Sequence, residues 1–244
     1  MKISRKSVSV IIPVFNEEGR IPNSWVKIES YFSKMSYFKE IIFVNDGSTD
    51  RTLVILQNLK ANLQVKIISL LKNKGKGFAI KSGVEAASGK IILFMDVDLS
   101  TPPETTEKFL KVYKDNCLLI GNRESRLSKL IKRQNYLREK AGQAFTVLAN
   151  LILKDNCSDY TCGFKVFPAS LGRKIFSLAK INRWAFDAEI VFLAKKLGAQ
   201  VKELPVTWEH RANSRVNLKR DVISTFFELL KIRYFDLTGK YANF

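Results

Sequence analysis

The chain has 244 residues, of which 46% are hydrophobic, and a formal net charge of +18. This apolar content supports a packed core and excludes a disordered chain, while no apolar run approaches the ~20 residues that a membrane-spanning helix needs. Three irregularly spaced cysteines and the single His210 exclude a disulfide framework and a Cys/His zinc site.

The excess of positive charge favours polyanionic partners, which are nucleic acid, acidic lipid surfaces or phosphorylated substrates. The alternative is a basic surface that only keeps the protein soluble. No helix-turn-helix, zinc-finger or aromatic RNA-binding motif is present, so no nucleic-acid partner is expected. Residues 1–6 lead straight into a strand-like segment, and no signal peptide is predicted.

Short apolar runs alternate with helical segments through the first half of the chain. The pattern predicts strands over 7–14, 40–44, 65–70 and 90–95. It predicts helices over 21–35, from the turn 45–50 to about 61, and over 78–87. Strands that alternate with helices of this length indicate βαβ units and an α/β fold with a mainly parallel sheet.

The second half is less regular. Helices are predicted over 106–113, 129–153 and 185–197, and strands over 118–121 and 201–208, with a loop at 159–165 entering another short strand. No repeat or linker is present, so residues 1–217 are predicted to form one catalytic domain. Residues 218–244 contain an amphipathic helix over 221–235, which predicts docking to a membrane or to another subunit; packing on the core is the alternative.

Polar clusters follow three of the predicted strands. They are Asn16-Glu17-Glu18, Asn45-Asp46 and Asp96-Val97-Asp98. Ligands of parallel sheets gather at the carboxyl ends of the strands, so these clusters predict a site at one sheet edge. The alternative is ordinary turn chemistry, because Asp and Asn often end strands.

Asp96 and Asp98 would point to opposite faces of an extended strand. If the backbone turns there, both carboxylates can reach one hard cation. Mg²⁺ and Mn²⁺ favour such sites, with one or two carboxylates completed by substrate phosphates and water. The motif therefore indicates a metal-dependent enzyme that acts on a phosphorylated or nucleotide-linked substrate.

Together these motifs resemble the family 2 glycosyltransferases, which have the GT-A nucleotide-sugar fold. The resemblance rests on three segments in order, Val10-Ile11-Ile12-Pro13-Val14-Phe15-Asn16-Glu17-Glu18, Asn45-Asp46-Gly47-Ser48-Thr49-Asp50-Arg51-Thr52 and Asp96-Val97-Asp98. Later segments resemble the dolichyl-phosphate glucosyltransferases and, next, the dolichyl-phosphate mannosyltransferases. These are Thr161-Cys162-Gly163-Phe164-Lys165, Arg183-Trp184-Ala185-Phe186-Asp187-Ala188-Glu189 and Leu204-Pro205-Val206 followed by Trp208.

The resemblance implies roles for residues on the donor side. The nucleotide site would be lined by Pro13, Phe15, Glu17, Asp46 and Lys76. Asp96 and Asp98 would bind Mg²⁺ or Mn²⁺ on the donor diphosphate. Ser100, a further possible ligand, stands where mannosyltransferase relatives often have Gln. A late basic loop would close over the diphosphate through Arg211, Ser214 and Arg215.

On the acceptor side, the resemblance implies that Arg123 and Arg138 bind the lipid phosphate. Gly142 stands where some relatives have a Ser. The family places the acidic motif of Asp187 and Glu189 near the active site. The alternative for that motif is a helix N-terminus, which acidic residues stabilise.

The implied reaction is inverting transfer of a hexose, above all glucose from UDP-glucose, to a polyprenyl or dolichyl phosphate. The nucleophile is a phosphate oxygen whose second pKa is near 6, so no protein base is required. The enzyme would act peripherally on the cytoplasmic face of an anionic membrane, with a monomer and a homo-oligomer as the open alternatives. The alternatives are mannosyl transfer from GDP-mannose, nucleotidyl transfer on a related fold, which expects a Gly-rich loop after the first strand, and a basic nucleic-acid-binding module.

Overall fold

The computed structural model describes residues 7–132, 135–211 and 218–242. Its main sheet has seven strands. Across the sheet they are β3 (Val65–Ser69), β2 (Phe38–Asn45), β1 (Val8–Val14), β4 (Ile91–Met95), β7 (Phe164–Pro168), β5 (Cys117–Asn122) and β8 (Gln200–Pro205). Neighbouring strands are parallel, except that β7 runs antiparallel to both β4 and β5. The predicted mainly parallel α/β sheet is confirmed.

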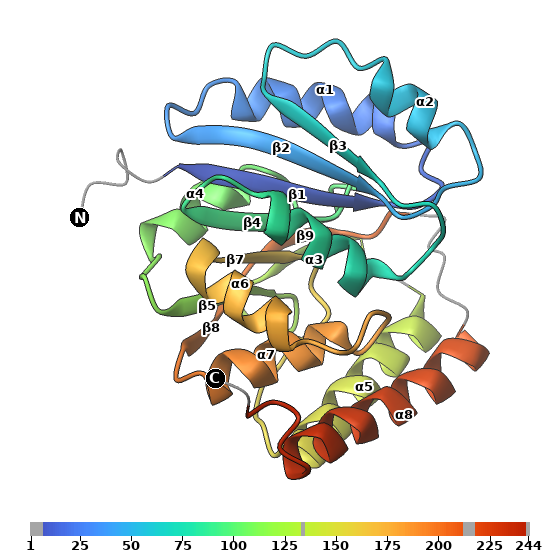
Figure 1. Ribbon diagram of the computed structural model, residues 1–244, viewed down its shortest axis with the longest axis vertical. Coiled ribbons are helices and arrows are strands. Elements are labelled where there is room, and N and C mark those ends of the chain that lie inside the picture. The colour runs from blue at the N-terminus through green and yellow to red at the C-terminus, as the bar shows by residue number, and fades with distance from the viewer. Residues whose placement is uncertain (1–6, 133–134, 212–217, 243–244) are drawn as a thin grey trace.

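Helices cover both faces of this sheet (Figure 1). One face packs on α1 (Ile21–Phe32), α2 (Thr52–Gln57) and α4 (Thr105–Lys111), and the other on α3 (Lys76–Ala86), α6 (Ala169–Leu178) and α7 (Phe186–Lys196). Successive strand residues alternate between the two cores: Val10 and Ile12 pack on one side, and Ile11 on the other. Because both faces are covered, the central strands β1 and β4 are almost continuously apolar.

Two longer helices, α5 (Tyr136–Leu153) and α8 (Leu218–Leu237), lie side by side at one end of the molecule (Figure 1). Leu229 and Ile232 of α8 are fully buried in the core, whereas Phe227 is 56% exposed. The predicted amphipathic helix therefore packs on the catalytic domain along one side. Among the described residues, no helix is both long and apolar enough to cross a bilayer.

Two local predictions from the sequence were wrong. The predicted helix 129–153 begins with a strand, β6 (Lys129–Lys132), and α5 starts only after Asn135, whose Oδ1 accepts the Leu137 backbone N–H. The predicted strand 201–208 is two strands, since β8 ends its pairing with β5 at Pro205 and the chain continues as β9 (Thr207–Glu209) beside β6.

The helix α6 was not predicted, although its sequence carries a helical signal. Its buried apolar residues recur three or four positions apart at Leu171, Ile175 and Leu178. The N-terminal residue Ala169 follows Pro168, the last residue of β7, without an intervening turn cluster. Without such a break, strand and helix run together in the sequence.

Candidate active site

The carboxyl ends of β1 and β2 are joined by hydrogen bonds between the segments that follow them. The Asn16 backbone N–H donates to Ser48 Oγ (2.8 Å), and the Thr49 N–H donates to Asn16 Oδ1 (2.7 Å). Asn16 has a φ of 54°, a left-handed conformation that Asn tolerates better than most residues. The predicted meeting of polar strand ends at one sheet edge is confirmed.

Asp46, at the end of β2, holds the loop that precedes α3. Its two carboxylate oxygens accept the backbone N–H groups of Lys74 (2.7 Å) and Gly75 (2.8 Å). The side chain is buried, and burial raises its pKa despite these two donors. Gly47 has a φ of +67°, and a Cβ there would lie 2.4 Å from the Lys72 carbonyl carbon, so only glycine fits. The implied contact between Asp46 and a nucleobase stays a prediction.

Asp96 and Asp98 follow β4, where the chain turns. The Leu99 N–H donates to the Asp96 carbonyl oxygen (3.3 Å), and Leu99 itself has a φ of 54°. The Ser100 N–H donates to Asp98 Oδ1 (2.9 Å). The backbone at Asp96 is fixed by its own N–H, which donates to the Gly163 carbonyl oxygen (3.2 Å). A turn replaces the extended geometry that would have separated the two carboxylates.

These two carboxylates fit a divalent cation that takes its other ligands from phosphate and water. Burial raises the pKa of Asp98, and the negative charge of Asp96 raises it further, so a cation bound nearby would favour ionised Asp98. Among the described residues, no cluster of three or more His, Cys, Asp or Glu side chains suited to a metal was found. Ser100 positions Asp98 through its N–H, and its role as a ligand stays a prediction.

Two lysines bring positive charge to this acidic edge. Lys76 Nζ, on the first residue of α3, lies 2.6 Å from Asp96 Oδ1. Burial opposes the charge of Lys76, but Asp96 and Asp187 outweigh it and raise the pKa of the ammonium. Lys165 is fully buried and donates to Asp187 Oδ1 (2.5 Å) and to the Cys162 carbonyl oxygen (2.8 Å). Asp187 therefore belongs electrostatically to the same cluster as Lys76 and Asp96.

Glu189 is separated from that cluster, although it lies only two residues from Asp187. Residues two apart on a helix do not face the same way. The Glu189 carboxylate is fully buried and accepts the N–H groups of Lys180 (2.8 Å) and Ile181 (2.9 Å) and the Tyr241 hydroxyl (2.5 Å). These contacts tie α7 to the preceding loop and to the C-terminal segment, and a role of Glu189 in the reaction stays a prediction.

Arg123 is held by partners from the loop before β7. Its Nε donates to Asp159 Oδ2 (2.7 Å), and its Nη2 donates to Asp159 Oδ1 (2.8 Å) and to Thr161 Oγ1 (2.6 Å). The guanidinium also lies over the Trp208 ring, 5.5 Å from the centroid. Sequence reasoning missed Asp159; a charged residue just before the Thr161–Lys165 motif was the available signal. Contact between Arg123 and a lipid phosphate stays a prediction.

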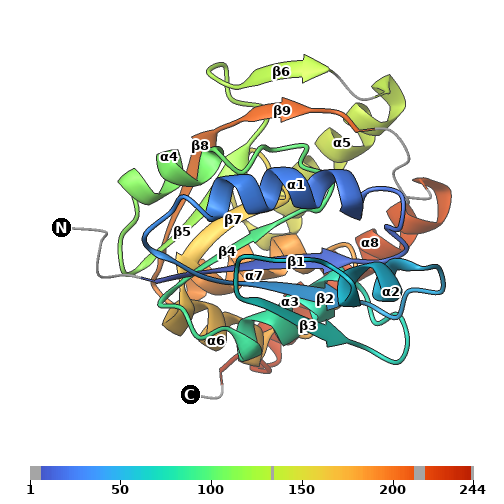
Figure 2. The ribbon, with the colours of Figure 1, turned by 90° about the horizontal axis from the view of Figure 1, so that it is seen from above.

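His210 follows β9 in the second sheet, in which β6 and β9 lie side by side (Figure 2). Its N–H donates to the Lys132 carbonyl oxygen (2.9 Å). Burial lowers the pKa of His210, the nearby charges of Arg138 and Lys132 lower it further, and Asp98 opposes them. Arg138 and Asp98 thus act on the same imidazole with opposite sign. Sequence reasoning missed this histidine, because nothing in its local sequence marks it.

The remaining predicted residues are placed as follows. Glu17 binds the Arg20 guanidinium through both oxygens (2.9 and 2.8 Å). Pro13 and Phe15, at the end of β1, are half-buried. Arg211 pairs with Glu209, with Nη2 2.8 Å from Oε2. Ser214 and Arg215 lie outside the described residues. Their implied roles at the nucleotide all stay predictions.

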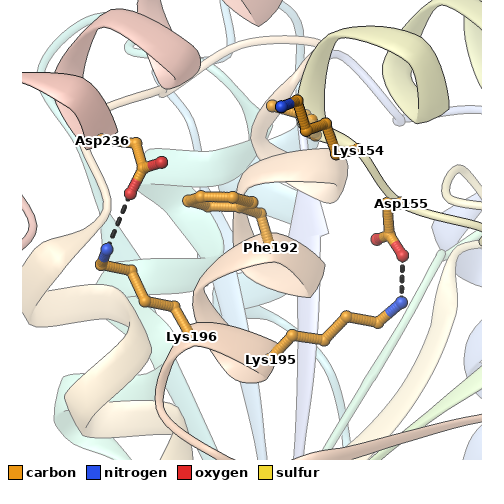
Figure 3. Close-up of a pocket in the computed structure, with 7 residues that line it drawn as sticks. Lys154, Asp155, Phe192, Lys195, Lys196 and Asp236 are labelled. Carbon is orange, nitrogen blue, oxygen red and sulfur yellow. Dashed lines mark hydrogen bonds and ion pairs between the residues drawn. The ribbon is translucent and has the colours of Figure 1, made fainter.

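A cavity of about 300 Å³ lies elsewhere, where α5, α7 and α8 meet (Figure 3). Its lining residues are Leu153, Lys154, Asp155, Phe192, Lys195, Lys196 and Asp236. Lys195 pairs with Asp155, and Lys196 Nζ lies 2.7 Å from Asp236 Oδ1, so much of the charge is balanced within the lining. None of the predicted site residues borders this cavity.

Comparison with curated proteins gives relatives along most of the chain. A dolichyl-phosphate β-glucosyltransferase of Saccharomyces cerevisiae is 31% identical over 97% of this chain and 77% of its own length. A human protein of the same name is 30% identical over 96% of the chain and 77% of its own length. One from Dictyostelium discoideum is 29% identical over 95% of the chain and 75% of its own length.

Solved structures share the fold at lower identity. Mannosyl-3-phosphoglycerate synthase from Rubrobacter xylanophilus superposes with a TM-score of 0.66 at 16% identity, covering 98% of this chain and 78% of its own. Glucosyl-3-phosphoglycerate synthase from Mycobacterium tuberculosis, in complex with Mn²⁺, UDP and glucosyl-3-phosphoglycerate, gives 0.62 at 21%, covering 93% and 81%. These neighbours confirm the GT-A fold. The family model "Glycosyl transferase family 2" matches residues 9–176, and the chain therefore belongs to that family.

Proposed function

We propose that this glycosyltransferase moves glucose from UDP-glucose to dolichyl phosphate, with inversion, to give a β-linked dolichyl-phosphate glucose. The observation that carries the proposal is the run of relatives with this activity in their names, which align along nearly the whole chain at about 30% identity. The family model, which matches residues 9–176, spans Asp46, Asp96 and Asp98. The donor and acceptor are proposed from these names.

On the donor side, Asp96 and Asp98 would hold Mg²⁺ or Mn²⁺ against the diphosphate. A divalent cation at this position supplies neutralisation of the charge that develops on the departing nucleotide. Asp46 fixes the loop of Lys74 and Gly75, and that loop places Lys76 beside Asp96. The chain thus positions its donor-binding groups through backbone contacts, which limits their reorganisation during the reaction.

On the acceptor side, the nucleophile is a phosphate oxygen that is already ionised near neutral pH. Arg138, near the start of α5, would bind this phosphate, and Arg123 would support the same region from its anchored position. Burial and the charges of Arg138 and Lys132 lower the pKa of His210, which favours the neutral imidazole. The residues' task is to align an anionic acceptor with the anomeric carbon, which is catalysis by positioning.

We also propose that α5 and α8 dock the enzyme to an anionic membrane, where a dolichyl chain resides. Large apolar side chains are exposed on both neighbouring helices. They include Tyr136, Leu137, Val147 and Leu151 of α5 and Ile223, Phe227, Leu230, Tyr234 and Leu237 of α8. The net charge of +18 adds attraction to acidic lipid. The cytoplasmic face and a homo-oligomer stay predictions.

A transfer assay tests the function. Purified protein is offered radiolabelled UDP-glucose, UDP-galactose or GDP-mannose with dolichyl phosphate and Mg²⁺ or Mn²⁺, and lipid-extractable label is counted. Label from UDP-glucose alone, in a product whose anomeric linkage is β by NMR, supports the proposal. Label from GDP-mannose instead would assign the mannosyltransferase alternative, and folded protein that transfers from no donor would refute the proposal.

Vesicle sedimentation tests the membrane surface. The double variant Phe227→Asp/Leu230→Asp should bind vesicles of phosphatidylcholine and phosphatidylserine at least tenfold more weakly than wild type. Val54→Asp on α2, which is also exposed, adds one acidic charge on a different surface and serves as the control. Equal binding of the double variant and wild type would exclude α8 as the docking helix.

A further inference from the structure

The side chain of Lys76 supplies a positive charge next to the carboxylates of the site. Its Nζ lies 2.6 Å from Asp96 Oδ1, and its charge also acts on Asp98 and Asp187. Its side chain remains about 29% exposed. The ammonium therefore contacts Asp96 while the Lys76 side chain stays partly open to solvent.

The second lysine of the cluster, Lys165, is hydrogen-bonded to partners other than Asp96. Lys165 is fully buried, with Asp187 at 2.5 Å and the Cys162 carbonyl oxygen at 2.8 Å. If Asp96, Asp98 and Asp187 are ionised, they carry three negative charges against the two positive charges of these lysines. If a divalent cation bound while Lys76 stayed in place, the net charge of the cluster would change from −1 to +1. The cation would also be repelled by the Lys76 ammonium on the same Asp96 carboxylate.

We infer that Lys76 is an internal counter-cation of the metal site, and that it couples metal binding to binding of the nucleotide diphosphate. Without nucleotide, Lys76 occupies Asp96 and weakens the hold of Asp96 and Asp98 on a divalent cation. A diphosphate offers Lys76 another anionic partner, so the ammonium leaves Asp96 and the cation takes its place. The inference rests on the proposed function, since it requires that the site bind both ligands.

The geometry allows this exchange without backbone movement. Asp46 holds the N–H groups of Lys74 and Gly75, and the Gly77 N–H donates to the Asn182 carbonyl oxygen (2.9 Å). These bonds fix the main chain on both sides of Lys76. Its four-carbon stem is flexible and carries three donors, so the side chain alone can move from carboxylate to phosphate.

The same loop supplies a matched control. Lys74 carries the same charge two residues earlier, but its Nζ lies over the Phe78 ring, 4.2 Å from the centroid. Lys74→Met therefore removes one positive charge from this loop without freeing Asp96. Lys76→Met removes the ammonium from Asp96 with a side chain of similar length, and Lys76→Arg keeps the charge.

The test measures Mn²⁺ binding by electron paramagnetic resonance of the free ion, with and without saturating UDP. Wild type should bind Mn²⁺ at least about tenfold more tightly with UDP, in the usual range of coupling between two ligands. Lys76→Met should bind Mn²⁺ without UDP about tenfold more tightly than wild type, and its enhancement by UDP should shrink by a similar factor. Lys74→Met and Lys76→Arg should keep most of the wild-type enhancement.

By reciprocity, Mn²⁺ should strengthen UDP binding by the same factor in wild type, which calorimetry measures independently. A Lys76→Met protein with wild-type Mn²⁺ affinity and wild-type enhancement would overturn the inference and leave the proposed function standing. An equal change in Lys74→Met would overturn it too, because the effect would then be one of net charge. Folded wild type that binds neither Mn²⁺ nor UDP would overturn both proposals.

Discussion

Gly163→Ala should disable the site through Asp96 without removing any functional group. A Cβ built on Gly163 would lie 1.9 Å from Asp96 Oδ2, whereas carbon atoms of this kind essentially never come closer than 3.0 Å. The carboxylate or the start of β7 must therefore move by about 1 Å. Misplacement of this size costs on the order of 100-fold in rate, or about 2.7 kcal/mol of transition-state stabilisation.

The assay compares kcat/KM for glucosyl transfer and the Mn²⁺ affinity in the presence of UDP. Both should fall in Gly163→Ala, while its thermal unfolding curve stays cooperative. Gly142→Ala is the matched control: no atom lies within 4 Å of its added Cβ, and Gly142 lies inside α5. There the exchange should stabilise the protein by about 0.5–1 kcal/mol. Transfer and Mn²⁺ affinity within threefold of wild type in Gly163→Ala would refute the assigned role of Asp96.

Asp98→Ala should lower transfer by at least about 1000-fold with an unchanged circular dichroism spectrum; near-wild-type activity would refute the metal assignment. Because the pKa of Asp98 is raised, Mn²⁺ affinity in wild type should fall as the pH drops through that raised value, as a pH titration of binding would show. Burial opposes ionisation of Glu40, but Lys66, Ser9 and Ser88 lower its pKa from 4.5 to about 2, so about 3 kcal/mol of stability should be present above pH 4.5 and be lost towards pH 2. Urea unfolding of Glu40→Gln at pH 7 should show that loss, and an unchanged midpoint would refute it. Asp187→Asn leaves the buried Lys165 ammonium without its carboxylate and should lower the free energy of unfolding by about 3–5 kcal/mol. The double variant Asp187→Leu/Lys165→Met should recover part of that loss in the same urea measurement, and a double variant no more stable than Asp187→Asn would contradict this.

The donor half of the site could be predicted because each of its parts lies directly after a strand. In β1, β2 and β4 the apolar runs are long and unbroken, and a parallel sheet brings their carboxyl ends together. The position of Asp96 and Asp98 at this sheet edge could therefore be predicted from the sequence alone. The partner of Asp96 did not: Lys76 reaches it only because Asp46 folds the intervening loop back. That step depends on backbone hydrogen bonds, which no residue pattern reveals.

The strands in the second half of the chain were harder to predict for a different reason. β7 enters the sheet between β4 and β5 and runs against both of them, so its neighbours come from separate parts of the sequence. Lys165, the second residue of β7, is charged and yet fully buried, which a pattern of apolar residues cannot anticipate. β6 has mostly exposed side chains and a helix-compatible sequence, and its strand conformation comes from pairing with β9.

That pairing also explains how the two halves of the site come to face one another. The Glu209 N–H of β9 donates to the Ser100 carbonyl oxygen (2.9 Å), two residues after Asp98. β9 in turn carries Trp208, whose ring lies under Arg123, and leads into His210. A backbone hydrogen bond thus ties the strand beside Arg123 to the turn that holds Asp96 and Asp98. The proposed inverting transfer needs donor and acceptor phosphates held at a fixed separation, and this tether from β9 to the turn after β4 would help to hold the proposed donor and acceptor residues at that separation.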